Sequence, residues 1–171
     1  MSFQDAIVEH LPHMRALARM FARDRAMADD LVQETVLRAL SNIDKFEPGT
    51  NMKAWLSTIL RNQFYNELRS RARLTAYQAI PRATEHCGEQ EAHLEMRDFE
   101  RAFHDLPAVQ REALSLVGGS GYSYEEAAKI VGCVQGTVKS RVCRARAELE
   151  RRLDRKVPAE APADSDMPIA A

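Results

Sequence analysis

Apolar residues recur at every third or fourth position along most of the chain. This periodicity is typical of helices that bury one face. It predicts helices over residues 3–22, after Asp24, and from about 52 to 75. Pro12, inside the first of these segments, indicates either a kink or a later helix start. The three apolar stripes are Ile7, Leu11, Met14, Leu17 and Phe21, then Val32, Val36, Leu40 and Ile43, then Leu56, Leu60, Phe64 and Leu68.

A second group of helical segments follows residues 76–94, where the periodicity is lost. Ser123 and Glu126 have the spacing of a capping box, which opens a short helix, and Gly132 suits the left-handed turn that ends it. No segment shows the two-residue alternation of a strand, so the predicted fold class is all-α. The other predicted helices are 95–105, 108–117 and about 135–156, with a loop at 118–123.

The pattern divides the chain into two small helical domains joined by a flexible linker. The first domain is predicted at residues 1–77 and the second at 95–156. Residues 78–94 contain a proline and a glycine without periodicity and are interpreted as the linker. Residues 157–171, rich in alanine, proline and acids, are predicted to be a disordered acidic tail.

Charge is close to balanced overall but is unevenly distributed. The formal net charge is −1, yet residues 136–156 hold eight Lys or Arg against three acids, and residues 85–105 hold seven acids against two arginines. Residues 61–73 form another basic segment. No apolar run approaches the roughly 20 residues of a membrane span, and the N-terminus lacks a signal-peptide pattern. These features predict a cytoplasmic protein without a membrane partner.

Candidate enzyme and metal chemistry is sparse. Cys87, Cys133 and Cys143 match no disulfide or zinc spacing. Only His86 and His93, beside Cys87, hint at a metal site, and a polar linker explains that group better. The sequence has no set of nucleophile, base and acid and no phosphate-binding glycine loop. We therefore expect neither an enzyme nor a bound metal or cofactor.

The segment around Gly132 fits a helix-turn-helix, in which two short helices meet at a glycine and the second one is basic. The outward face of the second helix has small residues at its centre and cations at its rim. Such a face suits the major groove, where close approach and donors to bases and phosphates are needed. The alternative is an ordinary amphipathic helix with a solvated basic face. The outward and flanking residues are Lys139, Ser140, Arg141, Cys143, Arg144 and Ala147.

Longer runs of the sequence resemble the bacterial extracytoplasmic-function (group IV) sigma factors. The runs 29-DDLVQETVLRAL-40, 43-IDKF-46 and 54-AWLSTILRNQFYNELRSRAR-73 resemble their region 2. The runs 106-LPAVQREALSLV-117 and 122-YSYEEAAKIVGCVQGTVKSRVCRARAEL-149 resemble their region 4. The details 44-DKFEPGTNMKAWL-56 and 118-GGSGYSYEEAA-128 are most similar to the EcfG-like general-stress subgroup.

The resemblance implies a sigma factor that binds core RNA polymerase, recognises the −35 and −10 promoter elements and promotes transcription initiation. It also implies a small helical anti-sigma partner of the NepR type. Polymerase binding is expected at Asp29, Asp30, Gln33, Glu34 and Arg38. Binding of the −10 element is expected at Lys45, Phe46, Asn51, Lys53, Arg61, Asn62, Tyr65, Asn66 and Arg69. Binding of the −35 element is expected at Thr137, Lys139, Ser140, Arg141, Cys143, Arg144 and Arg146.

Several alternatives remain at this level. Phe46 could stack on an unpaired base or close its loop as a hydrophobic staple, and Trp55 is expected to pack in the core. A thiol is a poor reader of base edges, which weakens the expectation for Cys143. The whole chain could instead be a helix-turn-helix regulator, or a sigma mimic that titrates an anti-sigma factor. The basic residues of region 4 favour genuine DNA binding over the mimic.

Overall fold

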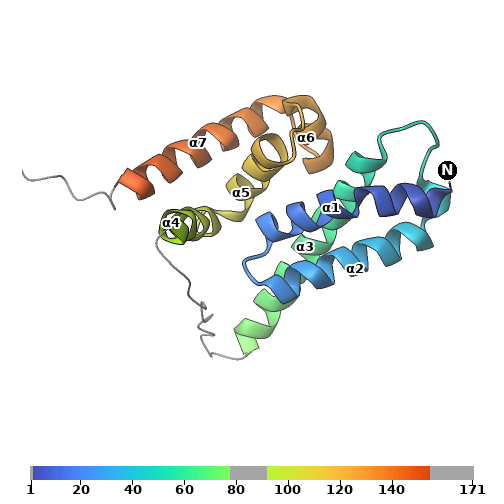
Figure 1. Ribbon diagram of the computed structural model, residues 1–171, viewed down its shortest axis with the longest axis horizontal. Helices are drawn as coiled ribbons and strands as arrows, with labels where there is room; N and C mark the ends of the chain where they lie inside the picture. The colour runs from blue at the N-terminus through green and yellow to red at the C-terminus, as the bar shows by residue number, and fades with distance from the viewer. Residues whose placement is uncertain (1, 78–91, 155–171) are drawn as a thin grey trace, which may run out of the picture.

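The computed structural model describes residues 2–77 and 92–154, and all regular structure in these segments is helical (Figure 1). The predicted all-α class is therefore confirmed for the described residues. The predicted acidic tail, residues 78–91 of the predicted linker, and His86 and Cys87 lie outside them, as does the side chain of His93. The linker ends earlier than predicted, because residues 92–94 are already helical. The elements are α1 (Phe3–Phe21), α2 (Arg25–Ser41), η1 (Ile43–Lys45), α3 (Met52–Tyr77), α4 (Ala92–His104), α5 (Ala108–Leu114), η2 (Ser115–Gly119), α6 (Tyr124–Val131) and α7 (Gln135–Asp154).

Helix α1 runs unbroken through Pro12. It opens with a capping box, in which the Ser2 hydroxyl accepts from the Asp5 amide and the Asp5 carboxylate accepts from the Ser2 amide. Pro12 cannot donate to the carbonyl of Val8 four residues earlier, but both residues are exposed, so water can satisfy that carbonyl. The predicted kink or late start is therefore not needed.

Helix α2 buries only the first part of the predicted stripe, since Val32 is buried and Val36 is half-buried against the core. It starts at the N-cap Asp24, as expected, but Leu40 and Ile43 are exposed. Thr35 is fully buried instead, because its hydroxyl donates to the Leu31 carbonyl at 2.6 Å and is thus satisfied without water. The buried face consists of Met27, Ala28, Leu31, Val32, Thr35 and Ala39.

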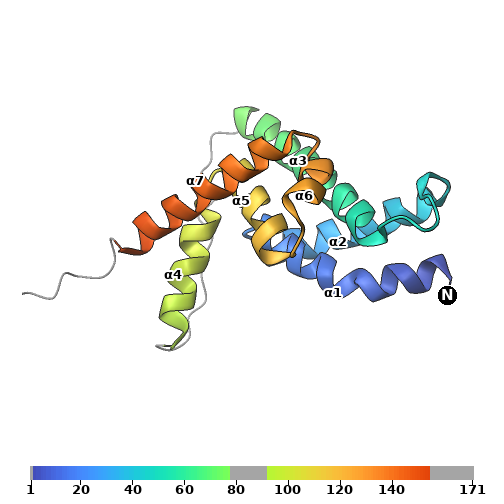
Figure 2. The same ribbon diagram turned by 90° about the horizontal axis from the view of Figure 1, so that it is seen from above.

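Helix α3 is the central element of the first domain and packs against α1 and α2 (Figures 1 and 2). Its predicted core line is confirmed, since Leu56, Leu60 and Phe64 are buried. The ring of Phe64 lies 5.3 Å from that of Phe21 on α1, a distance typical of packed aromatic pairs. Each such buried side chain contributes roughly 1.5–3 kcal/mol by leaving water.

In the second domain, α6 and α7 form the predicted helix-turn-helix. Ser123 and Glu126 make the capping box of α6, and Gly132 ends it at φ 75°, a left-handed conformation that glycine adopts without strain. The predicted loop at 118–123 starts later than expected, because Gly118 and Gly119 belong to the π-helical segment η2. The predicted stripe of α7 is confirmed as buried: Val138, Val142, Ala145 and Leu149.

The two domains share one hydrophobic core. Segment η2 and helix α5 pack against α1, and α6 packs against α3. Leu116 of η2 is fully buried in the cluster that also contains Met14 and Leu56 of the first domain. A Cβ atom at Gly119 would collide with the side chain of Met20 as it stands, so glycine permits this close approach. None of the described helices combines the length and apolarity that a bilayer span requires.

Candidate nucleic-acid interface

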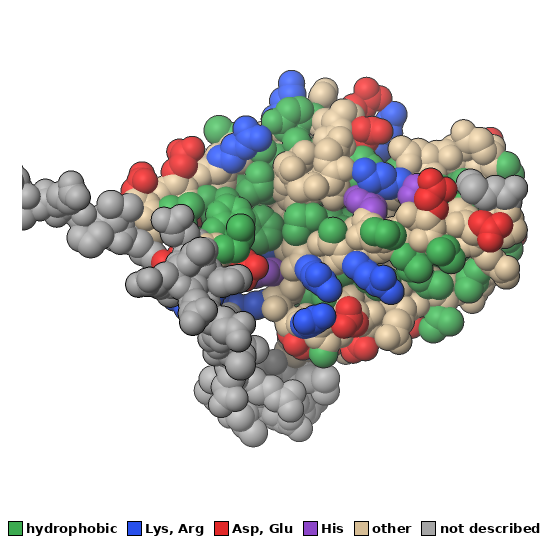
Figure 3. All heavy atoms as spheres, viewed as in Figure 1, with side chains coloured by type: hydrophobic (Ala, Val, Ile, Leu, Met, Phe, Trp, Pro, Cys, Tyr) green, Lys and Arg blue, Asp and Glu red, His purple; other side chains and the backbone are tan. Residues whose placement is uncertain are grey.

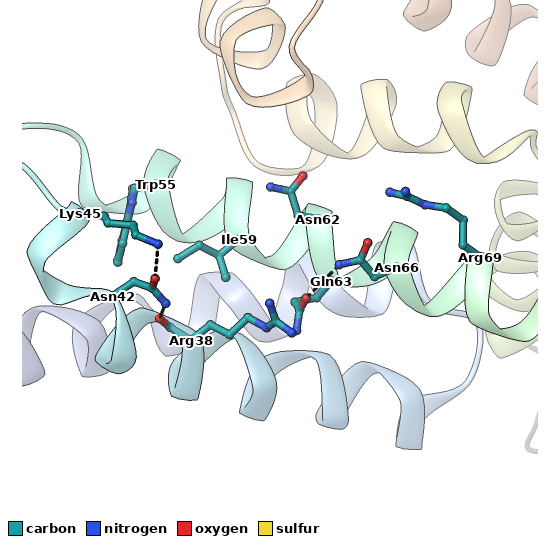
Figure 4. A pocket seen from close by; sticks show the side chains of 9 residues that line it. All are labelled: Arg38, Asn42, Lys45, Trp55, Ile59, Asn62, Gln63, Asn66 and Arg69. Atoms are coloured by element: carbon teal, nitrogen blue, oxygen red, sulfur yellow. Dashed lines mark hydrogen bonds between the residues drawn. The ribbon is translucent and has the colours of Figure 1, made fainter.

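A hollow of about 450 Å³ opens along the groove between α2 and α3 (Figure 4). Four of the residues predicted for the −10 element line it, namely Lys45, Asn62, Asn66 and Arg69. Its walls offer amide donors and acceptors together with cations, which are the groups needed to bind a base edge and its phosphates. The other lining residues are Arg38, Asn42, Trp55, Ile59 and Gln63.

Aromatic side chains cluster around Trp55, which lines this hollow. The ring of Phe46 lies 5.3 Å from that of Trp55 and 5.7 Å from that of Phe3, and it is half-buried there. This contact agrees with the staple interpretation of Phe46, whereas stacking on a base stays a prediction. Trp55 is also half-buried, and it both packs in this cluster and lines the hollow.

A second hollow, of about 410 Å³, lies farther along the same groove. Three residues predicted to bind polymerase line it, namely Asp30, Glu34 and Arg38. The other two, Asp29 and Gln33, are exposed on α2. Apolar side chains are also exposed on or beside α2, at Leu37, Leu40 and Ile43. This surface combines acids with apolar area, which suits a basic helical partner.

Three residues predicted for the −10 element are engaged by the second domain instead. Glu112 of α5, whose side chain has no exposed area, accepts from Arg61 Nε at 2.5 Å and from the Tyr65 hydroxyl at 3.1 Å. Lys53 Nζ donates to the Ser120 carbonyl at 2.8 Å. The Nε group of Arg61, the Tyr65 hydroxyl and the Lys53 ammonium are thus engaged in contacts between the two domains, and their binding to DNA stays a prediction.

Glu112 is the electrostatic centre of the domain contact. Burial raises the pKa of its carboxyl, while Arg61, Tyr65 and the charge of Arg141 act in the opposite direction. Burial and the Glu112 charge together raise the pKa of the Tyr65 hydroxyl, so that group stays protonated. Arg141, predicted for the −35 element, thus acts on the same carboxyl as two residues of the −10 set.

A smaller polar cluster joins α1, α3 and the loop before α6. The hydroxyls of Ser57 and Tyr122 are 2.8 Å apart, and His13 Nε2 lies 3.2 Å from Ser57 Oγ and 3.4 Å from the Tyr122 oxygen. Lys53 lies over the Tyr122 ring, 4.6 Å from its centroid. Burial, with smaller contributions from the Lys53 and His10 charges, lowers the pKa of His13 to about 4.

Helix α7 presents most of its predicted −35 residues to solvent. Lys139, Cys143, Arg144 and Arg146 are exposed, whereas Arg141 is half-buried. Thr137 and Ser140 are also half-buried, and Ser140 Oγ donates to the Thr137 carbonyl at 2.9 Å, which leaves its lone pairs for another donor. Figure 3 shows Lys and Arg side chains along the edge where α7 runs, followed by acids toward its C-terminal end.

Sequence reasoning missed several residues of these sites. Gln63, Glu112 and Tyr122 were not singled out, and Lys53 was assigned only to DNA. A signal for Glu112 was available, because it shares a helical face with Leu116 four residues later. A carboxylate on a core face needs a buried donor or cation. No local pattern indicates Gln63.

Comparisons with known proteins bear on both domains. The family model of Sigma-70 region 2 matches residues 6–74, and that of Sigma-70, region 4 matches residues 96–149. The solved sigma factor RpoE from Bartonella quintana, in complex with the anti-sigma factor NepR, superposes with a TM-score of 0.79 at 43% identity. The match covers 89% of this chain and 96% of that one.

Curated relatives agree with these matches. The ECF RNA polymerase sigma factor EcfG of Rhodopseudomonas palustris is 51% identical over 150 residues, which span 86% of this chain and 83% of the relative. The ECF sigma factor SigC of Mycobacterium tuberculosis is 38% identical over 137 residues, covering 74% and 70%. The chain belongs to the ECF family of RNA polymerase sigma factors.

Proposed function

We propose that this sigma factor reads the −10 promoter element with the α2–α3 groove and the −35 element with α7. The observation that carries the proposal is the hollow that gathers Lys45, Asn62, Asn66 and Arg69 in one place. An unpaired base needs such an enclosed set of amides and cations, because it has lost both its stacking and its pairing partners. Exposed Arg144 offers the matching fork for a base edge in the duplex.

Core polymerase would dock on α2, where Asp29, Asp30, Gln33, Glu34 and Arg38 lie beside exposed apolar side chains. The two family-model matches support functional units at residues 1–77 and 95–156. We infer that the protein acts in the cytoplasm, with core polymerase and the promoter, as a binding subunit without a catalytic site or cofactor of its own.

We also infer that a small helical anti-sigma protein of the NepR type holds this sigma factor inactive, and that it serves genes of the general stress response. The support is the 43% identical Bartonella quintana sigma factor, which was solved with NepR, together with the 51% identical EcfG. Co-purification with a NepR-type protein, followed by loss of transcription when that protein is added, tests this part of the proposal.

Run-off transcription with core polymerase on a promoter library tests the DNA assignments. Arg144→Ala should weaken discrimination at the −35 element by about tenfold or more, and Asn62→Ala should do so at the −10 element, since a base contact is worth roughly 1–3 kcal/mol. Each variant is the control for the other, because each should keep wild-type preference at the element it does not read. Arg151→Ala, on the same helix but paired with Glu148, should leave both preferences intact. Unchanged preferences in both site variants would refute the assignments.

A further inference from the structure

A polar bridge crosses the α2–α3 groove between the two hollows. On one side Arg38 Nε donates to Glu34 Oε1 at 2.8 Å, and from the other side Gln63 Nε2 donates to the same oxygen at 2.9 Å. Asn66 Nδ2 then donates to Gln63 Oε1 at 3.4 Å. Arg38, Gln63 and Asn66 line both hollows, so this bridge is the partition between them.

The carboxylate of Glu34 fixes the direction of the bridge. An ionised carboxylate only accepts hydrogen bonds, so the end of Gln63 that faces it must be the amide nitrogen. The carbonyl oxygen of Gln63 then faces Asn66, and this oxygen requires a donor from Asn66. Gln63 is only 8% exposed, so water cannot replace these partners at little cost.

The two asparagines of the first hollow are consequently held with opposite polarity. The amide nitrogen of Asn66 points to Gln63, and its carbonyl oxygen points to the side where Asn62 and Arg69 lie (Figure 4). Arg61 Nη1, which only donates, lies 3.3 Å from Asn62 Oδ1 and leaves the amide nitrogen of Asn62 for a ligand. Both asparagines are exposed to an incoming strand. The hollow therefore offers one acceptor and one donor.

We propose that Gln63 is a positioning residue for base recognition, which holds Asn66 with its acceptor toward the base. Gln63 itself stays buried and contacts the base only through Asn66. The base read by Asn66 must therefore present an N–H donor at that point. Without Gln63, the Asn66 amide turns freely and presents donor or acceptor alike, so discrimination at that position is lost. This inference rests on the proposed function, because it assigns the hollow to an unpaired −10 base.

The test is run-off transcription by the holoenzyme on promoters that carry each base at each −10 position. Gln63→Leu should lower discrimination about fivefold at one position, the size expected for a single hydrogen bond, and leave the other positions unchanged. Gln4→Leu, the same replacement at an exposed site on α1, is the matched control and should keep wild-type discrimination. Unfolding by urea is measured in parallel to register any general destabilisation.

An exchange of partners distinguishes positioning from mere packing. Gln63→Glu alone places two carboxylates face to face and should also lose discrimination. Combined with Glu34→Gln, it restores one donor and one acceptor, and the new carboxylate still accepts from Asn66. Because Glu34 also lies on the proposed polymerase surface, all variants are compared at core polymerase concentrations that saturate the double variant. The double variant should therefore regain discrimination at the same position.

Wild-type discrimination at all positions in Gln63→Leu, or equal loss at every position, would overturn the role of Gln63. A folded double variant that fails to regain discrimination would also overturn it. If the unmodified holoenzyme shows no base preference at any −10 position, the proposed function fails instead. The two failures are thus separated within one experiment.

Discussion

The imidazole of His13 makes the stability of this protein depend on pH in a defined direction. Folding holds its pKa at about 4, against 6.5 for an unperturbed histidine, mainly because the ring is buried against Ser57 and Tyr122. As the pH falls, the unfolded chain therefore takes up the proton first. The contribution of His13 is complete above pH 6.5 and is lost progressively as the pH approaches 4.

The magnitude follows from the two pKa values. Each unit of difference in pKa corresponds to about 1.4 kcal/mol. About pH 5 lies roughly one and a half units below the pKa of the unfolded chain, so His13 is almost fully protonated in the unfolded state and still mostly neutral in the folded state. Between about pH 7.5 and about pH 5, His13 should thus remove about 2 kcal/mol from the free energy of unfolding. Burial of the Glu112 carboxyl acts in the opposite direction, so the effect must be isolated by comparing variants.

The assay is urea unfolding followed by circular dichroism at the two pH values. His13→Gln keeps a polar group near the position of Nε2 but does not titrate, so it should lose about 2 kcal/mol less than the wild type on acidification. His10→Gln, one turn earlier on α1, keeps the Ser57–Tyr122 cluster and removes only the small contribution of the His10 charge to the His13 pKa, so it should stay close to the wild type. An equal loss in the wild type and in His13→Gln would refute the reasoning.

Two further predictions concern the contact between the domains. Glu112→Ala leaves Arg61 partly buried without its carboxylate and should lower the free energy of unfolding, measured by urea titration, by about 2–3 kcal/mol. The control Glu125→Ala removes an exposed i,i+4 ion pair and should lower it by under about 0.5 kcal/mol. Leu116→Ala removes a fully buried side chain from the shared core and should lower the free energy of unfolding by about 3 kcal/mol, which is measured as a lower thermal midpoint. A loss below about 1 kcal/mol would show that the two domains do not rely on that packing.

Local physics made the helices predictable. Periodic apolar positions marked α1, α3 and α7, and hydrogen-bonding side chains at Ser123 and Glu126 marked the start of α6, because both signals act within a few residues. The predicted face of α2 was wrong at Leu40 and Ile43, and the reason is physical. Apolarity ranks Leu40 above Thr35, but a hydroxyl that donates to a carbonyl of its own helix is easily buried.

The candidate site was predictable as a set of residues but not as a geometry. Resemblance supplied Asn62, Asn66 and Arg69, and the structure brings them to one hollow. The resemblance could not indicate that Arg61 is paired with a carboxylate 51 positions away, because such a pair depends on how the two domains pack. The role of Gln63 was hidden for the same reason, since its partner Glu34 is 29 positions away on another helix.

If Arg61 binds a phosphate of the −10 element, as the resemblance implies, its ion pair with Glu112 would also affect how promoter affinity responds to ionic strength. An arginine that neutralises a phosphate releases condensed cations from DNA, and each such release steepens the fall of affinity with added salt. Transfer of Arg61 from Glu112 to a phosphate strips that carboxylate of its counter-charge, so a cation from solution is taken up as another leaves the DNA. The two movements offset each other. The slope of log affinity against log salt concentration would then correspond to one basic contact fewer than the interface contains.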